Sequence, residues 1–161
     1  MQDNKVLWVI ITTILVVIFA YSLFFSRPSY IVTFDSSGGA AVNEQEISRN
    51  DSVTRPNDPV REGYNFVGWI LNNEEFDFET PVTGAMTLVA SWDAIILTVT
   101  FNSNGGTAVE DLEIAHGNAL DRPSNPTRRN FRFVEWRLDG EAFDWDTPIT
   151  EDIELVAHWR R

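Results

Sequence analysis

The chain has 161 residues, no cysteine and a formal net charge of −12. The lack of cysteine excludes disulfides, a thiol nucleophile and cysteine-ligated metals. The acidic balance argues against nucleic acid or anionic lipid headgroups as partners, because both require basic surfaces. A chain of this length has room for a short anchor and two small units, whose cores depend largely on aromatic side chains.

An uncharged, apolar stretch runs from Val6 to Phe25. At about 1.5 Å per residue, a helix of about 20 residues crosses a hydrocarbon core of about 30 Å. Residues 1–27 are therefore predicted to be a membrane anchor helix with its core at 6–25. Aromatic residues near both ends of the stretch, such as Trp8 and Tyr21, suit the membrane interface.

The same stretch has a rival interpretation as a cleaved signal peptide. Ala20-Tyr21-Ser22 resembles a small-residue cleavage site, but apolar residues continue past it to Phe25, which favours an uncleaved anchor. Lys5 and Arg27 flank the stretch with nearly balanced charge, so the charge rule decides the orientation only weakly. We predict that the remaining chain lies outside the cell, because a short amino-terminal tail before one apolar span is typical of an uncleaved export signal.

Residues 30–92 and 97–159 are two copies of one sequence. Phe34 returns as Phe101, and the same offset of 67 positions holds through both copies without a gap. Each copy closes with Leu-Val-Ala-x-Trp, ending at Trp92 and Trp159. This register indicates a tandem-repeat protein, which we divide into module 1 (residues 28–94) and module 2 (residues 95–161).

Each copy begins with a predicted hairpin. Alternating apolar and polar residues at 30–35 and 97–102 indicate a half-buried strand. The Gly-Gly pair that follows permits a tight reversal, and the segments 42–47 and 109–114 are predicted to return as the second strand.

A middle strand is expected at 66–71, with Phe66 and Gly68 on one face and Val67 and Trp69 on the other. The acidic residues after Phe76 alternate with aromatic ones, which predicts a further half-buried strand. The last strand ends each copy and carries its tryptophan on the apolar face.

The prolines at 55–59 and 122–126 exclude the centre of a sheet, so a loop or short helical turn is expected there. Glycine and asparagine exchange at two positions, Asn50 with Gly117 and Gly63 with Asn130, which predicts left-handed turn residues. The resulting fold class is mostly β (small α+β), with about four strands per module. The short link at residues 93–94 predicts a semi-rigid rod of touching modules.

At these residues the chain resembles the internalin-type B-repeat, also called the Listeria-Bacteroides repeat. The resemblance is carried by Val-Thr-Phe-x-Ser-x-Gly-Gly, Pro-x-x-Pro-x-Arg, Phe-Val-x-Trp, Thr-Pro-x-Thr and the closing Leu-Val-Ala-x-Trp. It implies two tandem β-grasp-like modules, a place in the bacterial cell envelope, and a role in adhesion, partner binding or extension from the membrane. The second copy departs from the pattern at 128–136, where Asn130 and Glu135 replace two glycines and further charge is added, so a binding surface shared across the family is in doubt there.

Nothing in the pattern predicts an enzyme, a cofactor or a metal site. The only histidines are His116 and His158. The equivalent positions of the first copy hold Arg49 and Ser91, so the copies share no histidine that could act as a catalytic base. Asp77 and Glu79 could offer carboxylates to calcium, but a calcium site needs six to eight oxygens and no Asp-rich loop is present.

The candidate interaction face consists of arginines. Arg128, Arg129, Arg132 and Arg137 form a basic cluster that could meet an acidic partner or a polysaccharide, or could be a solvated face with local ion pairs. Repeated arginines complete the predicted set: Arg55, Arg61, Arg122, Arg128, Arg129 and Arg132.

The sequence thus predicts a membrane-anchored, non-enzymatic cell-envelope protein that presents two modules for adhesion or protein-protein interaction. The partner would be an unknown protein or cell-surface component. The alternative is a passive spacer or assembly subunit of a membrane complex. Repetition that is confined to buried and turn positions would favour the spacer, whereas repeated exposed residues would favour a binding face.

Overall fold

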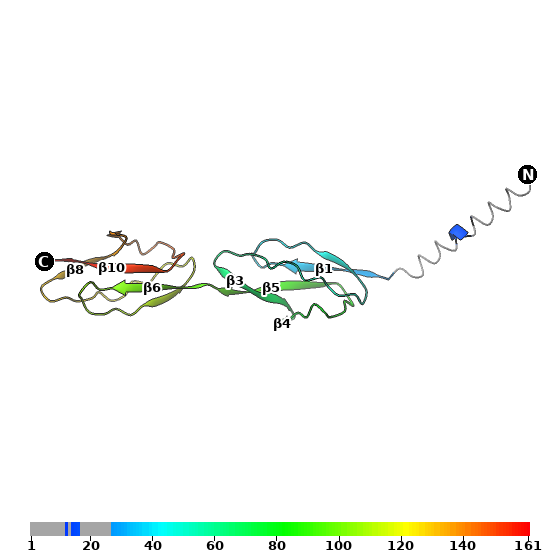
Figure 1. Cartoon of the computed structure of the whole chain (residues 1–161), viewed down its shortest axis with the longest axis horizontal. Helices are drawn as coiled ribbons and strands as arrows, with labels where there is room; N and C mark the ends of the chain where they lie inside the picture. Colours follow the sequence, from blue (N-terminus) through cyan, green and yellow to red (C-terminus); the bar gives the residue numbers. More distant parts are fainter. Residues whose placement is uncertain (1–11, 13, 17–26) are drawn as a thin grey trace, which may run out of the picture.

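The computed structural model describes residues 12, 14–16 and 27–161. Residues 27–161 form two β modules that lie end to end (Figure 1). The predicted anchor at 6–25 falls mostly outside the described residues. Among those that are described, no helix combines the length and apolar character that a membrane crossing requires.

Each module contains one five-stranded sheet of the same topology. The strands of module 1 are β1 (Ser29–Asp35), β2 (Gln45–Ser48), β3 (Tyr64–Leu71), β4 (Glu74–Glu75) and β5 (Met86–Ala94). Those of module 2 are β6 (Ile96–Asn102), β7 (Leu112–Ala115), β8 (Arg132–Leu138), β9 (Glu141–Ala142) and β10 (Ile153–Arg160).

The sheet orders are β2-β1-β5-β3-β4 and β7-β6-β10-β8-β9. The first and last strands of each module pair in parallel, and all other neighbours are antiparallel. The prediction of a mostly β tandem repeat is therefore confirmed. The segment that connects β2 to β3 is a loop, and residues 27–161 contain no helix.

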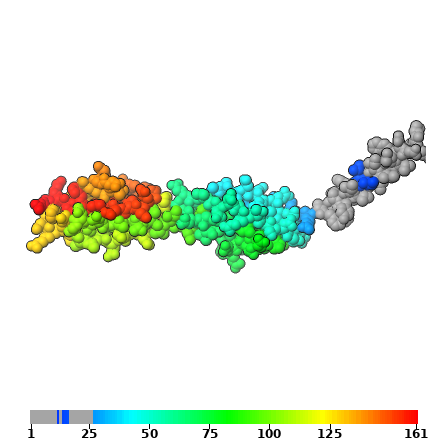
Figure 2. All heavy atoms as spheres, in the orientation of Figure 1, coloured from blue at the N-terminus to red at the C-terminus, as the bar shows by residue number. Residues whose placement is uncertain are grey.

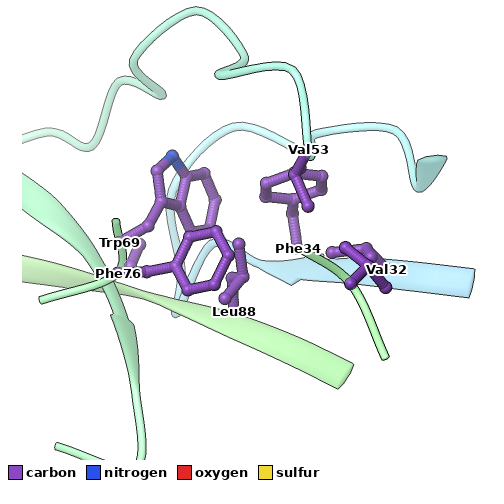
Figure 3. Packing of buried hydrophobic residues seen from close by; sticks show 8 residues of the cluster. Val32, Phe34, Val53, Trp69, Phe76 and Leu88 are labelled. Carbon is purple, nitrogen blue, oxygen red and sulfur yellow. The ribbon is translucent and has the colours of Figure 1, made fainter. Parts of the chain in front are cut away.

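A buried tryptophan lies at the centre of each module. Trp69 is 1% exposed, and its ring meets Phe34 edge-on at 4.9 Å and Phe66 at 5.6 Å between centroids. Val53 belongs to the loop between β2 and β3, which we call the crossing loop. Figure 3 shows Val53 above the β1 residue Phe34, so that this loop covers one face of the sheet. Trp136 repeats the arrangement at 2% exposure in module 2.

The first turn needs glycine for two different reasons. Ser37 and Gly38 have φ values of 47° and 90°, and the amide of Gly39 donates to the carbonyl of Ser36 at 2.9 Å, as in a type I′ turn. Gly39 itself has no positive φ, but a Cβ there would lie 2.5 Å from the Trp92 ring. The second glycine therefore allows the turn to approach the tryptophan.

The exchange of glycine and asparagine at the other turns is confirmed. Asn50 and Gly117 have φ values of 71° and 82°, while Gly63 and Asn130 have values of 76° and 64°. These are the two residue types that enter the left-handed region at least cost.

The predicted faces of the middle strand are wrong because of a β-bulge. The pairing of β3 with β5 shifts between Phe66 and Gly68, so Val67 is an extra residue. Phe66 consequently packs on the same side as Trp69, and Val67 is 55% exposed. A strict alternation cannot reveal such an insertion.

The strand predicted after Phe76 is also wrong. Of the residues that follow β3 in sequence, only Glu74–Glu75 pairs with it as a strand before the chain turns. The Asp77 carboxylate accepts a hydrogen bond from the Glu79 amide at 2.9 Å, and the Asp77 carbonyl accepts one from Thr80 at 3.0 Å. Asp77 thus stabilises a turn, and alternation arises there without strand pairing.

The two modules make direct contact, as the short link predicts. The link is one residue, Ile95, because β5 extends to Ala94. Its amide donates to the Gly63 carbonyl at 2.9 Å, and its carbonyl accepts from the His116 amide at 2.9 Å. The His116 imidazole packs against Gly63, where an added Cβ would meet Nδ1 at 2.7 Å.

Truncation of the central tryptophan tests whether packing holds module 1 together. We expect Trp69→Ala to lower the free energy of unfolding by about 3–5 kcal/mol, because the ring is replaced by a cavity, and this is a large part of a small domain's stability. Calorimetric melting measures the change. Val67→Ala is the control, since an exposed side chain should alter stability by less than about 0.5 kcal/mol. An unchanged melting curve for Trp69→Ala would refute a packing-driven core.

A second substitution tests the junction. In Gly63→Ala the methyl group would displace His116, so we expect faster hydrogen exchange at the Ile95 amide than in the native chain. Gly140→Ala provides a matched control, because Gly140 also has a positive φ of 89° but no atom within 4 Å of an added Cβ. Equal exchange rates at Ile95 in both variants would show that the contact does not hold the modules.

Candidate interaction surface

Two of the predicted arginines stack on rings at equivalent positions. The Arg61 guanidinium carbon lies 3.8 Å from the centroid of the Tyr64 ring, and that of Arg128 lies 4.2 Å from Phe131. Arg128 also donates through Nη1 to the Asn104 carbonyl at 3.0 Å. Both side chains are therefore held in place by their own module.

Arg55 and Arg122 form a second equivalent pair. Arg55 Nη2 lies 3.1 Å from Asp58 Oδ1 in an exposed ion pair, which contributes little stability. The Arg55 guanidinium lies 5.7 Å from the centroid of the Phe78 ring. Arg122 lies 5.1 Å from the Trp145 ring and lines a recess of about 250 Å³. Arg55 and Arg122 thus lie beside rings of the turns that follow β4 and β9, and they do not join Arg61 or Arg128.

The structure brings three of the predicted residues together at one end of module 2. Arg128 and the exposed Arg129 lie in the turn just before β8, and Arg132 is the first residue of β8. Two arginines outside the predicted set join them. Arg160 is the direct cross-strand partner of Arg132, and Arg161 lies 5.5 Å from the Phe131 ring. The signal was readable, because both arginines follow the closing tryptophan of the repeat.

Arg137 does not belong to this group, contrary to its place in the predicted basic cluster. Its Nη2 atom lies 2.9 Å from Glu135 Oε1, and His158 Nδ1 lies 3.5 Å from the same oxygen. The hydrogen bond from Arg137 lowers the pKa of Glu135 below its ordinary value of 4.5, and His158 acts in the same direction. Module 1 has Gly68 where Glu135 stands, so this ion network is specific to module 2.

A shallow groove recurs in both modules beside the proline loops. It measures about 420 Å³ in module 1, between residues 40–45 and 56–60, and about 360 Å³ in module 2. Alanine, valine and proline residues line both grooves together with polar and acidic ones such as Glu44 and Glu110, and neither lining contains a histidine. Within residues 27–161 and the few described before them, no three His, Asp or Glu side chains are placed to hold a metal ion.

Comparison with known proteins identifies the repeat. The family model of the Listeria-Bacteroides repeat domain matches residues 30–91 and 98–158. Internalin H of Listeria monocytogenes is 26% identical over 127 residues, which cover 74% of this chain and 22% of that protein. No solved structure matches the chain.

Two proteins of Evansella cellulosilytica are more similar in sequence. One, named "Putative membrane protein", is 38% identical over 138 residues, which cover 81% of this chain and 21% of that protein. The other, named "Putative Gly-rich membrane protein", is 35% identical over 138 residues, or 81% of this chain and 16% of its own length. The chain thus spans about a fifth of the length of these relatives. Since the family model covers both modules, the chain belongs to the Listeria-Bacteroides repeat family and carries two tandem copies of the repeat.

Proposed function

We propose that this chain is a membrane-anchored bacterial cell-envelope protein that presents its two modules outside the cell for adhesion or protein-protein contact. The main observation that supports this proposal is the end-to-end arrangement of the modules (Figure 1). The start of β1 and the end of β10 lie at opposite ends of the pair, so an anchor before β1 would place the arginines of module 2 far from the membrane.

Two further observations support the anchoring. The stretch from Val6 to Phe25 has the length and apolar character of a membrane-spanning helix in the sequence. Two relatives carry names that describe membrane proteins.

The alternative is a spacer or assembly subunit of a membrane complex. It is favoured by the kind of residue that repeats between the copies, since most are core or turn residues such as Trp69 and Trp136 or Gly39 and Gly106. The backbone hydrogen bonds at Ile95 would also suit a spacer, because they restrict bending between the modules. A spacer requires the length of the two modules, whereas a contact protein requires the side chains at the end of module 2 that faces away from module 1.

Protease treatment of cells tests the proposed topology. In wall-free protoplasts that express the chain with a carboxy-terminal tag, we expect external trypsin to remove the tag, because Arg129, Arg132 and Arg160 are exposed. A cytoplasmic marker should stay intact. The tag of untreated cells should stay in the membrane pellet after an alkaline wash, because an apolar helix resists extraction.

Two outcomes would contradict the proposal. A tag that stays protected until the cells are lysed would place the modules inside the cell. Release of the untreated chain into the alkaline wash or the medium would show that no anchor holds it, as expected for a cleaved signal peptide.

A further inference from the structure

Three segments lie at the end of module 2 that faces away from module 1, which we call the distal tip: residues 102–106, 128–132 and 158–161. The Trp159 indole donates to the Ser103 carbonyl at 3.0 Å, and Arg128 donates to the Asn104 carbonyl at 3.0 Å. Arg160 stands opposite Arg132 in the pairing of β10 with β8. The red end of β10 marks this tip, at the end of module 2 that faces away from module 1 (Figure 2).

The distal tip concentrates positive charge on an acidic chain. Its three segments contain five arginines and no aspartate or glutamate: Arg128, Arg129, Arg132, Arg160 and Arg161. The equivalent segments of module 1 (35–39, 61–65 and 91–94) contain one arginine and three acidic residues. With histidine neutral, the formal side-chain charge is +5 at the tip and −2 at the same places in module 1. Because both modules share one fold, the fold does not require the charge.

The arrangement is unfavourable for the isolated tip. Arg132 and Arg160 are direct cross-strand neighbours, and like charges in that position repel. Arg128 and Arg161 both lie near the Phe131 ring, at 4.2 and 5.5 Å. In the described part of the chain, none of the five arginines forms an ion pair. A bound anion would relieve this repulsion.

The residue types favour phosphate as the anion. All the cations of the two modules are arginines, whose planar fork binds phosphate and carboxylate with two hydrogen bonds. Carboxylates are the weaker candidate, because residues 28–161 themselves carry 23 of them and none pairs with the tip. A tip selective for carboxylates would bind other copies of the chain.

Nucleic acid is less suitable than a polymer that carries phosphates alone. Binding of single strands usually includes stacking of bases on free aromatic rings. At the tip, Phe131 is already in contact with two guanidinium groups, and Trp159 is partly buried against the core of module 2. Five adjacent charges exceed what one phosphate needs, which points to a linear polymer.

We propose that the distal tip binds the phosphate groups of a linear, non-nucleic anionic polymer. This inference deepens the proposed contact function by naming the chemistry of the partner. The phosphate-binding inference and the proposed function can fail separately, because polymer binding by the purified chain depends on neither export nor membrane anchoring.

The probe is fluorescently labelled inorganic polyphosphate, added to the full chain in a nonionic detergent and followed by fluorescence anisotropy. We expect saturable binding that weakens with salt, because counterions are released from the polymer. Arg132→Gln combined with Arg160→Gln should weaken binding about tenfold and reduce the slope of log K against log salt by about 1 to 1.5, at roughly 0.7 per contact for a single strand.

The matched control changes the same charge at the other end of the chain. Arg27→Gln with Arg49→Gln should change affinity by less than about twofold, because neither arginine lies at the tip. Arg129→Gln with Arg161→Gln is a second tip variant, and it should lose affinity as the first does. Melting temperatures check that each variant folds. Polyglutamate and single-stranded DNA of equal charge should both bind more weakly than polyphosphate.

Several results would overturn the inference. The first is the absence of saturable polyphosphate binding at about 50 mM salt, where contacts with phosphate are strong. The second is an equal loss of polyphosphate affinity in the tip variants and in the control variant. Polyglutamate that binds as tightly as polyphosphate would reassign the site to acidic protein segments. Tighter binding of DNA would reassign it to nucleic acid.

Discussion

The packing of one tryptophan against the crossing loop is the interaction on which each module depends. Each module buries a sheet on one face only, and its cover is a loop and turns without a helix. Such a cover has few backbone hydrogen bonds of its own, so it must be held by side chains. Trp69 and Trp136 fill this space, with Phe34 and Phe101 edge-on beside them. The closing tryptophans extend the stack through Phe66 and Phe133 to the first turn.

The sequence predicts what depends on periodicity and backbone conformation. The paired glycine and asparagine positions identify left-handed turns, because few other residues adopt that conformation cheaply. The bulge at Val67 was not predictable, since it is set by cross-strand pairing, which a single strand's pattern does not record. The turn at Asp77 was missed for a related reason, because a carboxylate bonded to its own backbone leaves the same alternation as a strand.

The candidate surface was predictable in part. Spacing along the chain placed Arg128, Arg129 and Arg132 together. The two arginines that join them, Arg160 at the end of β10 and Arg161 just after it, lie 28 and 29 positions beyond Arg132 in the sequence. Cross-strand register also separates Arg137 from the group and places it beside Glu135. The two modules therefore share a core and differ in surface. Gly63 and Gly68 of module 1 become Asn130 and Glu135, which changes what the ends and the open face of the sheet can contact.

The parallel pairing of the first and last strand in each module has a mechanical consequence. A pull on the two ends of the described chain would act on the start of β1 and the end of β10. Within module 1, β1 and β5 run in the same direction over Val32–Asp35 and Met86–Val89, so tension would load their hydrogen bonds together, in shear. The β6–β10 pair has the same geometry in module 2. Shear resists rupture better than the one-by-one opening of a hairpin, so the fold is suited to a tether that bears force along its length.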